Sequence, residues 1–407
     1  MKKGIVITIG DELLQGFTYD SNASWISKYL TASKVNVVRR LTLPDCEEII
    51  YDNVLFLLNN EKISYVIITG GLGPTHDDIT KNVLKKCFNK KLVVHKQYLH
   101  DLRKRFNDKG VQVPENIDSQ ATILEGSLPI ENLNGSALGM HIVVNNINFI
   151  VLPGVPLEMK QMLQDCNIFN YNKNNDNFHT FKTSGIYESK LYALLSKYIL
   201  KNQSFKVAFL PKYSGVNIRI SKNKNVSDKS FLKFKNQVRK IIKKYIYTEA
   251  EETIQEVVSN KLLKLKLTLS IAESCTGGLI SKKMTDLPGA SKYLLGSIVA
   301  YSNDVKQKIL NVDDETIKKY GAASKEVALE MVKGIKVLTN SDVSIATTGI
   351  SGPSGGSKEK PVGLIYIAIS YKDNYIVKKF NLIPNRDLHR EIASNVALNM
   401  LRLLIEK

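Results

Sequence analysis

The sequence has 407 residues, of which 43% are hydrophobic and 24% are charged. This length corresponds to two or three domains of ordinary size, and the composition excludes wholesale disorder and a fibrous repeat. Lys and Arg outnumber Asp and Glu by 57 to 39, which gives a formal net charge of +18. A general enrichment in Lys, Asn and Ile explains this excess, and a polyanionic partner is the alternative.

The cysteines predict no disulfide framework and a reducing, cytoplasmic location, because they lie far apart and form no CxxC or metal-ligand spacing: Cys46, Cys87, Cys166 and Cys275. The apolar N-terminal stretch is interrupted by Asp11 and Glu12 and lacks a cleavage-site pattern, so it does not predict a signal peptide. No run of about 18 apolar residues predicts a membrane span.

The first segment alternates strands with helices. We expect strands at 4–9, 35–41, 64–69 and 147–152, and helices at 21–30, 47–59 and 79–88, with a short helix after Pro156. Strands joined by helical crossovers form a parallel sheet covered on both faces. Ligands of such sheets bind at the carboxyl ends of the strands, where the loops 10–16 and 69–78 fall.

These two loops carry glycines, hydroxyls and carboxylates. A Gly-Gly-x-Gly turn with hydroxyls fits a diphosphate, which makes nucleotide-binding candidates of Gly10, Gly70, Gly71, Gly73 and Thr75. Carboxylates at neighbouring strand ends suit a hard divalent cation that bridges phosphate oxygens, and the candidate ligands are Asp11, Asp45, Asp77 and Asp78. The alternative is that these aspartates only cap helices.

A linker and a basic unit follow. Residues 167–179 contain six asparagines in thirteen positions and no apolar period, which predicts an exposed linker and a domain boundary. The next unit reads as α+β, with helices at 188–200 and 229–247 and strands at 206–210 and 216–221. Residues 201–248 hold thirteen basic residues and one acidic residue. A solvated helix face explains this charge, and nucleic-acid binding is the alternative, although no GxxG clamp occurs here.

The third unit begins near residue 250 and again alternates. We expect strands at 268–272, 296–301, 343–348, 364–370 and 375–381, and helices at 253–264, 279–285, 304–310, 324–338 and 387–405. The last helix repeats apolar residues at a period of four, which predicts that it docks on a core.

The first chemistry-bearing segment of this unit follows a strand and precedes a helix. Ser274, Cys275 and Thr276 are followed there by Gly277 and Gly278. A hydroxyl beside backbone N–H groups at a helix start is what acyl transfer needs, because preset donors must meet the developing oxyanion. The alternative is that Ser274 or Thr276 merely caps the helix.

A serine hydroxyl is a poor nucleophile until a base takes its proton. No histidine lies between His179 and His389, so the predicted base is Lys306, provided that burial keeps it neutral. Tyr301 would orient this lysine or relay the proton. Alternatively, Lys306 is an ordinary surface lysine, and Cys275 is a rival nucleophile that lacks an obvious activating group.

A second loop, 347–357, is rich in glycines and hydroxyls at the end of a strand. Such a loop can cradle a phosphate, and the planar fork of an arginine just before the last helix could complete the site. The candidates are Gly352, Ser354, Gly355, Gly356, Ser357 and Arg386. The loop matches neither the Walker nor the GxGxxG pattern, so nothing in it points to ATP or a dinucleotide, and an ordinary glycine-serine loop is the alternative.

Over essentially its whole length the chain resembles the CinA family of bacterial competence- and damage-inducible proteins. The resemblance is carried by 10–14 and 69–78, by 185–189, 210–211 and Arg219, and by 272–278, 301–303, Lys306 and 349–363. It implies a three-layer α/β/α molybdopterin-binding-like domain with a mostly parallel sheet at 1–168. It further implies a small α+β KH-like domain at 169–249 and an α/β nicotinamide-nucleotide amidase domain at 250–407.

The resemblance also implies an activity. The amidase would convert nicotinamide mononucleotide to nicotinic acid mononucleotide and ammonia without a cofactor, with Ser274 as nucleophile, Lys306 as base and Tyr301 as helper. The first domain would be a metal-dependent ADP-ribose pyrophosphatase, and the chain a homodimer. Two positions depart from the family pattern, Leu138 in place of proline and Ala323 in place of valine. A pterin- or nucleic-acid-binding protein without enzymatic activity is the alternative.

Overall fold

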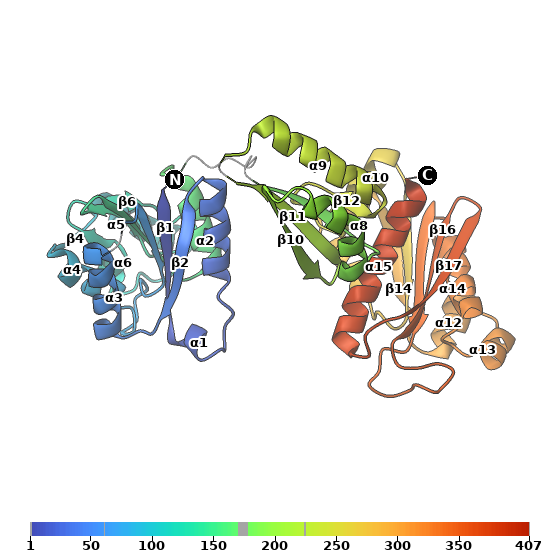
Figure 1. Ribbon diagram of the computed structural model, residues 1–407. Helices are drawn as coiled ribbons and strands as arrows, with labels where there is room; N and C mark the ends of the chain where they lie inside the picture. Colours follow the sequence, from blue (N-terminus) through green and yellow to red (C-terminus); the bar gives the residue numbers. More distant parts are fainter. Residues whose placement is uncertain (1, 61, 170–177, 224, 407) are drawn as a thin grey trace. The chain divides into compact units, whose positions relative to one another are not determined.

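The computed structural model describes residues 2–60, 62–169, 178–223 and 225–406, and the chain divides into two compact units, Met1–Asn175 and Asp176–Lys407 (Figure 1). Most of the predicted asparagine-rich linker, 170–177, lies outside the described residues. Phe169 is not exposed as that prediction required. It is buried against Tyr29 and Tyr65 in the core of the first unit.

In the described part of the first unit, six strands form one sheet in the order β2-β1-β3-β8-β7-β6. The strands β1, β2, β3 and β8 run parallel, and β6 and β7 are antiparallel additions at one edge. Their bounds are β1 Lys3–Ile9, β2 Asn36–Leu43, β3 Tyr65–Thr69, β6 Leu128–Ile130, β7 Gly139–Val144 and β8 Ile147–Leu152. A separate antiparallel pair joins β4 (Leu92–Val94) to β5 (Thr122–Leu124).

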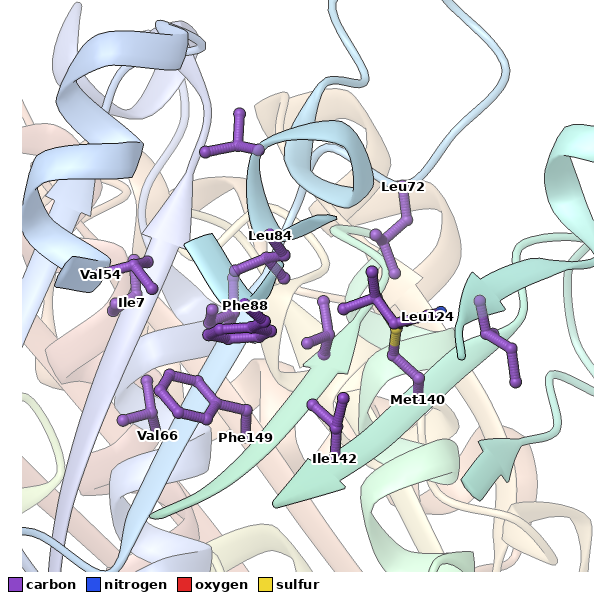
Figure 2. Packing of buried hydrophobic residues seen from close by; sticks show 14 of the residues in the cluster. Ile7, Val54, Val66, Leu72, Leu84, Phe88, Leu124, Met140, Ile142 and Phe149 are labelled. Carbon is purple, nitrogen blue, oxygen red and sulfur yellow. Dashed lines mark hydrogen bonds between the residues drawn. The ribbon is translucent and has the colours of Figure 1, made fainter. Parts of the chain in front are cut away.

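The helices of this unit cover both faces of the sheet. They are α1 Asp11–Leu14, α2 Ser21–Ala32, α3 Glu47–Asn60, α4 Thr80–Phe88, α5 Lys96–Asp108, α6 Ile117–Gln120 and α7 Pro156–Asp165. Alternate residues of a strand point to opposite faces, so Ile5 and Ile7 of β1 pack under α3, α4 and α5, whereas Val6 packs under α2 and α7. Figure 2 shows the first of these cores, where the rings of Phe88 and Phe149 lie 4.8 Å apart. The predicted three-layer α/β/α architecture is confirmed.

The middle region is a four-stranded antiparallel sheet, in the order β10-β11-β9-β12, with two helices packed against it through a common core (Figure 1). Its elements are β9 Phe178–Thr183, α8 Glu188–Leu200, β10 Phe205–Lys212, β11 Gly215–Lys222, α9 Asp228–Ile242 and β12 Ile246–Thr248. The predicted helix 229–247 was too long. It ends at Ile242, and after one 3₁₀ turn the β-prone residues 246–248 pair with β9, forming a strand that the sequence pattern did not predict.

The C-terminal region has a mixed sheet in the order β14-β13-β15-β16-β17, in which β13, β14 and β15 are parallel and β16 and β17 antiparallel. The strands are β13 Leu269–Glu273, β14 Leu294–Val299, β15 Val343–Gly349, β16 Leu364–Tyr371 and β17 Asn374–Asn381. One face is covered by α10 Ile254–Leu265, α11 Leu279–Thr285 and α15 Arg386–Ile405, and the other by α12 Asn303–Leu310, α13 Asp314–Tyr320 and α14 Lys325–Thr339. The α/β expectation is confirmed, whereas the short polar helix α13 was not foreseen.

Candidate active site

Ser274 occupies a tight turn between strand β13, which lies between β14 and β15, and helix α11. Its N–H donates to the carbonyl of Thr347 on the neighbouring strand over 3.0 Å, and its own carbonyl accepts from the N–H of Gly277 over 3.1 Å. The turn closes because Gly277 and Gly278 adopt φ values of 59° and 88°, a left-handed conformation that glycine adopts without strain. The turn therefore holds the serine at the carboxyl edge of the sheet.

Lys306 reaches this serine from helix α12. Its Nζ lies 3.2 Å from Ser274 Oγ, 2.8 Å from the carbonyl oxygen of Ala300 and 3.1 Å from that of Tyr301. The residue is 1% exposed, and burial lowers the pKa of its amine. A neutral amine has two N–H donors and one lone pair. Two carbonyls are available for the donors, which leaves the lone pair to accept the proton of the Ser274 hydroxyl.

The two parts of Tyr301 have different partners. Its main-chain carbonyl accepts from Lys306, as described above, whereas its exposed phenol oxygen accepts a hydrogen bond from Arg386 over 2.9 Å. The second terminal nitrogen of Arg386 donates to the carbonyl of Gly352 over 2.9 Å. Tyr301 is thus brought to the site, and its contact with the predicted base is made by the main chain.

Cys275 also lines the site, next to the serine. It is 6% exposed, and burial raises the pKa of its thiol to about 12. The thiolate is the nucleophilic form of cysteine, so at neutral pH this residue is held in its unreactive form.

A cavity of about 390 Å³ opens beside these groups. Its lining includes Ser274, Cys275, Tyr301, Lys306, Thr348, Ile350, Ser351, Lys360 and Arg386. Of the predicted phosphate-loop residues, Gly352 is buried and bonded to Arg386, while Ser354, Gly355, Gly356 and Ser357 are exposed on the same loop outside this lining. Lys360 falls within the family motif 349–363 but was not predicted as a site residue. It lines the cavity instead.

The predicted oxyanion donors are partly committed to other bonds. Gly277 uses its N–H to close the turn, and the Thr276 hydroxyl shares a hydrogen bond of 2.7 Å with the Thr347 hydroxyl. The first amides of α11 are also occupied: the buried carboxylate of Glu273 accepts from the N–H of Ile280 over 3.1 Å and of Ser281 over 2.8 Å. Sequence reasoning missed Glu273, which caps α11 from the end of β13.

Helix α15 contributes two further residues that sequence reasoning missed. His389 is fully buried with its Nδ1 2.8 Å from the hydroxyl of Ser351, and Nε of Arg390 donates to the carbonyl of Thr276 over 3.1 Å. Residues three and four positions apart share one face of a helix, so Arg386, His389 and Arg390 face the same loops. The sequence shows this spacing, but the spacing alone does not indicate a functional role, because it does not reveal which loops the three residues contact.

Comparison with known proteins finds relatives and family models for nearly the whole chain. Three family models match it: a probable molybdopterin binding domain over residues 5–169, the KH domain of damage-inducible protein CinA over 179–248, and the CinA C-terminal domain over 251–405. A CinA-like protein of Thermosipho melanesiensis is 38% identical over 100% of both chains. A CinA-like protein of Thermotoga maritima is 35% identical over 99% of this chain and 98% of its own.

The chain belongs to the CinA family. Among solved structures, competence/damage inducible protein CihA from Agrobacterium tumefaciens is 34% identical and covers 38% of this chain and 98% of its own, with a TM-score of 0.37. The CinA protein of Thermoplasma acidophilum, described as having unknown function, is also 34% identical and covers 40% and 94%, with a TM-score of 0.37. The full-length relatives carry the assignment, which confirms the resemblance read from the motifs.

The N-terminal domain of this CinA-family chain brings its glycine-rich turn to the carboxyl edge of β1, β3 and β8. Gly70 has a φ of 112°, and a Cβ there would lie 2.2 Å from the carbonyl oxygen of Ile9. Gly71 has a φ of 67°, and its Cβ would lie 2.2 Å from Thr80 Oγ1. Both positions therefore require glycine for the close approach of β1 and α4, with or without a ligand. Gly10 precedes α1 at the same edge.

The structure places the four predicted metal ligands in three separate sets of contacts. Asp11 and Asp45 come together, because the N–H of each donates to the carboxylate of the other over 3.0 and 3.2 Å. Burial, with the charges of Asp11 and its neighbours, raises the pKa of Asp45. Asp78 accepts from both the N–H and the hydroxyl of Thr75, over 2.9 and 2.6 Å, and Asp77 contacts His76 over 2.7 Å.

Across residues 2–60, 62–169, 178–223 and 225–406, no group of three or more His, Cys, Asp or Glu side chains is arranged to hold a metal ion. Of the four, Asp11 and Asp45 are the two that contact each other. Two carboxylates do not complete a cation site by themselves, and Mg²⁺ bound by one or two carboxylates takes further ligands from water and substrate phosphates.

The basic middle domain presents a groove of about 570 Å³ along α9, lined by Tyr198, Leu232, Asn236, Gln237 and three lysines, Lys229, Lys233 and Lys240. Lys243 and Lys244 follow in the adjoining 3₁₀ turn. In the described part of the chain, no helix is both long and apolar enough to cross a membrane.

Proposed function

We propose that the C-terminal domain hydrolyses the carboxamide of nicotinamide mononucleotide to nicotinic acid mononucleotide and ammonia. The observation that carries the proposal is the buried contact of 3.2 Å between Lys306 Nζ and Ser274 Oγ. A base with a lowered pKa that touches a hydroxyl is the arrangement that activates a serine for acyl transfer. The CinA-family membership of the chain supports the choice of this amide.

The reaction proceeds through an acyl-enzyme. Lys306 takes the hydroxyl proton as Ser274 Oγ attacks the amide carbon. The backbone N–H groups of Thr276 and Gly278 stabilise the oxyanion of the tetrahedral intermediate, since the N–H of Gly277 closes the turn. Collapse of the intermediate breaks the carbon–nitrogen bond, and Lys306 returns the proton to the departing nitrogen, which leaves as ammonia. Water then attacks the ester with Lys306 again as base, which releases the carboxylic acid and restores Ser274.

The charge at the cavity favours a phosphorylated substrate. Lys360 and Arg386 both line it. Lys360 can bind a phosphate oxygen in addition to its carbonyl partner, and Arg386 in addition to the Gly352 carbonyl and the Tyr301 phenol. Together they support the proposal of a mononucleotide as substrate in preference to free nicotinamide.

The decisive experiment measures ammonia release by the intact chain. Wild-type protein should release ammonia from nicotinamide mononucleotide and much less from nicotinamide, and Ser274→Ala should release almost none. A Ser274→Ala variant that retains most of the activity would exclude this serine as the nucleophile.

We further propose that the N-terminal domain hydrolyses the pyrophosphate of ADP-ribose with a divalent cation. The observation that favours it is the paired approach of Asp11 and Asp45 beside the glycine-rich turn. The cation would neutralise phosphate charge, and these two carboxylates would hold it. Intact protein with ADP-ribose and Mg²⁺, Mn²⁺ or Co²⁺ should yield AMP. Folded protein that yields none with any of the three would refute the proposal.

A further inference from the structure

Ser351 connects helix α15 to the nucleophile turn. Its side chain lines the active-site cavity, and its Oγ lies 2.8 Å from His389 Nδ1 and 3.3 Å from the carbonyl oxygen of Cys275. Ser351 is 5% exposed and His389 is 0% exposed, so water does not compete for these bonds. The three groups form a chain from the helix, through the hydroxyl, to the peptide that follows Ser274.

The direction of these hydrogen bonds follows from the acceptor at one end. A carbonyl oxygen can only accept, so when both contacts are made together the Ser351 hydroxyl donates to Cys275 and His389 Nδ1 donates to the Ser351 oxygen. The ring is then neutral, with its proton on Nδ1, in agreement with its pKa, which burial lowers. Among the described residues Nε2 has no partner in hydrogen-bonding geometry, and an interaction with the backbone of Gly363 acts against the effect of burial on the pKa of the ring.

We propose that His389, acting through Ser351, is a positioning residue that sets the orientation of the Cys275–Thr276 peptide and so of the nucleophile turn. This inference rests on the proposed amidase activity of the same site. The peptide unit is planar and trans, so its carbonyl and N–H point in opposite directions, and fixing the Cys275 carbonyl also fixes the direction of the Thr276 N–H. Arg390 holds the next carbonyl, that of Thr276. Two successive peptides beside Ser274 are therefore tied to α15.

The test compares three variants of the intact chain for ammonia release from nicotinamide mononucleotide. Ser351→Ala and His389→Leu remove the connection, whereas His389→Asn keeps an N–H donor near the position of Nδ1. We expect the first two to lower kcat about tenfold to a hundredfold with KM changed by less than about threefold, because small misplacements of a nucleophile are costly. His389→Asn should retain kcat to within about threefold. Ser370→Ala, which removes another buried serine hydroxyl, is the matched control and should leave both constants unchanged.

A second measurement does not depend on activity. In ¹⁵N-histidine-labelled protein, the ring signals that disappear in His389→Asn identify His389. They should report a neutral ring protonated at Nδ1, and Ser351→Ala should shift them. A proton on Nε2, an effect on KM alone, or a His389→Asn variant as impaired as His389→Leu would each overturn the proposal. If wild-type protein releases no ammonia, the amidase proposal fails, and the ring signals still decide whether the connection to Ser351 exists.

Discussion

The side-chain nitrogen of Lys306 lies 3.2 Å from the hydroxyl oxygen of Ser274, although 32 residues separate them in the sequence. The adjacent parallel strands β13 and β14 explain this contact. Glu273 pairs with Val299, so the chain leaves both strands side by side, with Ser274 beside Ala300. The first turn of α12, capped by Ser302, then directs Lys306 back toward the serine.

Ser274→Ala is expected to lower kcat for ammonia release by at least about 10³-fold, because removing a catalytic nucleophile leaves only binding and oxyanion stabilisation. Cys275→Ala is the control and should retain most of the activity, since its thiol is not ionised near neutral pH. Circular dichroism should show both variants folded. The reverse result, an inactive Cys275→Ala and an active Ser274→Ala, would reassign the nucleophile.

The amidase rate is expected to rise with pH and to fall as pH decreases through the pKa of Lys306. Only the unprotonated amine can accept the serine proton, and burial lowers its pKa below the usual 10.5. The pH profile of kcat/KM for the wild type measures this directly. Lys306→Arg should be inactive at every pH tested, because a guanidinium stays protonated. A profile that is flat, or that rises toward acid, would exclude Lys306 as the base.

Glu273→Gln is expected to destabilise the protein by about 1–3 kcal/mol, because hydrogen bonds to a buried charged group are lost or weakened. The carboxylate now accepts from the Ile280 and Ser281 amides and from the Ser281 hydroxyl. Urea unfolding followed by circular dichroism measures the change. Glu359→Gln, in an exposed loop, is the matched control and should shift stability by less than about 0.5 kcal/mol. Equal effects of the two substitutions would contradict a structural role for Glu273.

Asp11→Asn and Asp45→Asn are each expected to abolish any metal-dependent release of AMP from ADP-ribose and to leave ammonia release unchanged. Each removes one of the two carboxylates that approach each other in the N-terminal domain. Product chromatography with and without a chelator measures the first activity. Asp101→Asn, on the exposed side of α5, is the control. If both variants release AMP as fast as the wild type, the metal must be held by other residues.

The nucleic-acid alternative also makes a measurable prediction. If the basic middle domain binds a phosphate backbone, affinity for single-stranded RNA or DNA should fall steeply with salt, because phosphate contacts release counterions. Replacing Lys240, Lys243 and Lys244 by Gln should then remove the affinity and flatten the salt dependence. Binding that is absent at low salt would attribute the positive charge to the general lysine enrichment of the chain.

The sequence by itself determined the layers of this protein and the strands and helices that border the candidate active site, whereas the elements between residues 92 and 144 and the strand β9 were not predicted. The central strands are continuous runs of buried residues, as expected for a sheet covered on both faces, and apolar residues recur every three or four positions in the helices. These patterns are sufficient to place Ser274 and the glycine-rich turn at 70–73 at the ends of strands. The same local pattern failed at 246–248, because a strand three residues long shows no period and is identified only by its partner, β9.

Only the tertiary structure decided which of these residues meet. Parallel pairing of β13 and β14 joins Lys306 to Ser274, and the docking of α15 brings His389 to Ser351 across 38 residues. The same packing pairs Asp11 with Asp45, which are 34 positions apart, whereas Asp78 is engaged locally by Thr75, three positions away. The direction of a loop side chain depends on contacts with distant segments, and a one-dimensional pattern holds no record of those contacts.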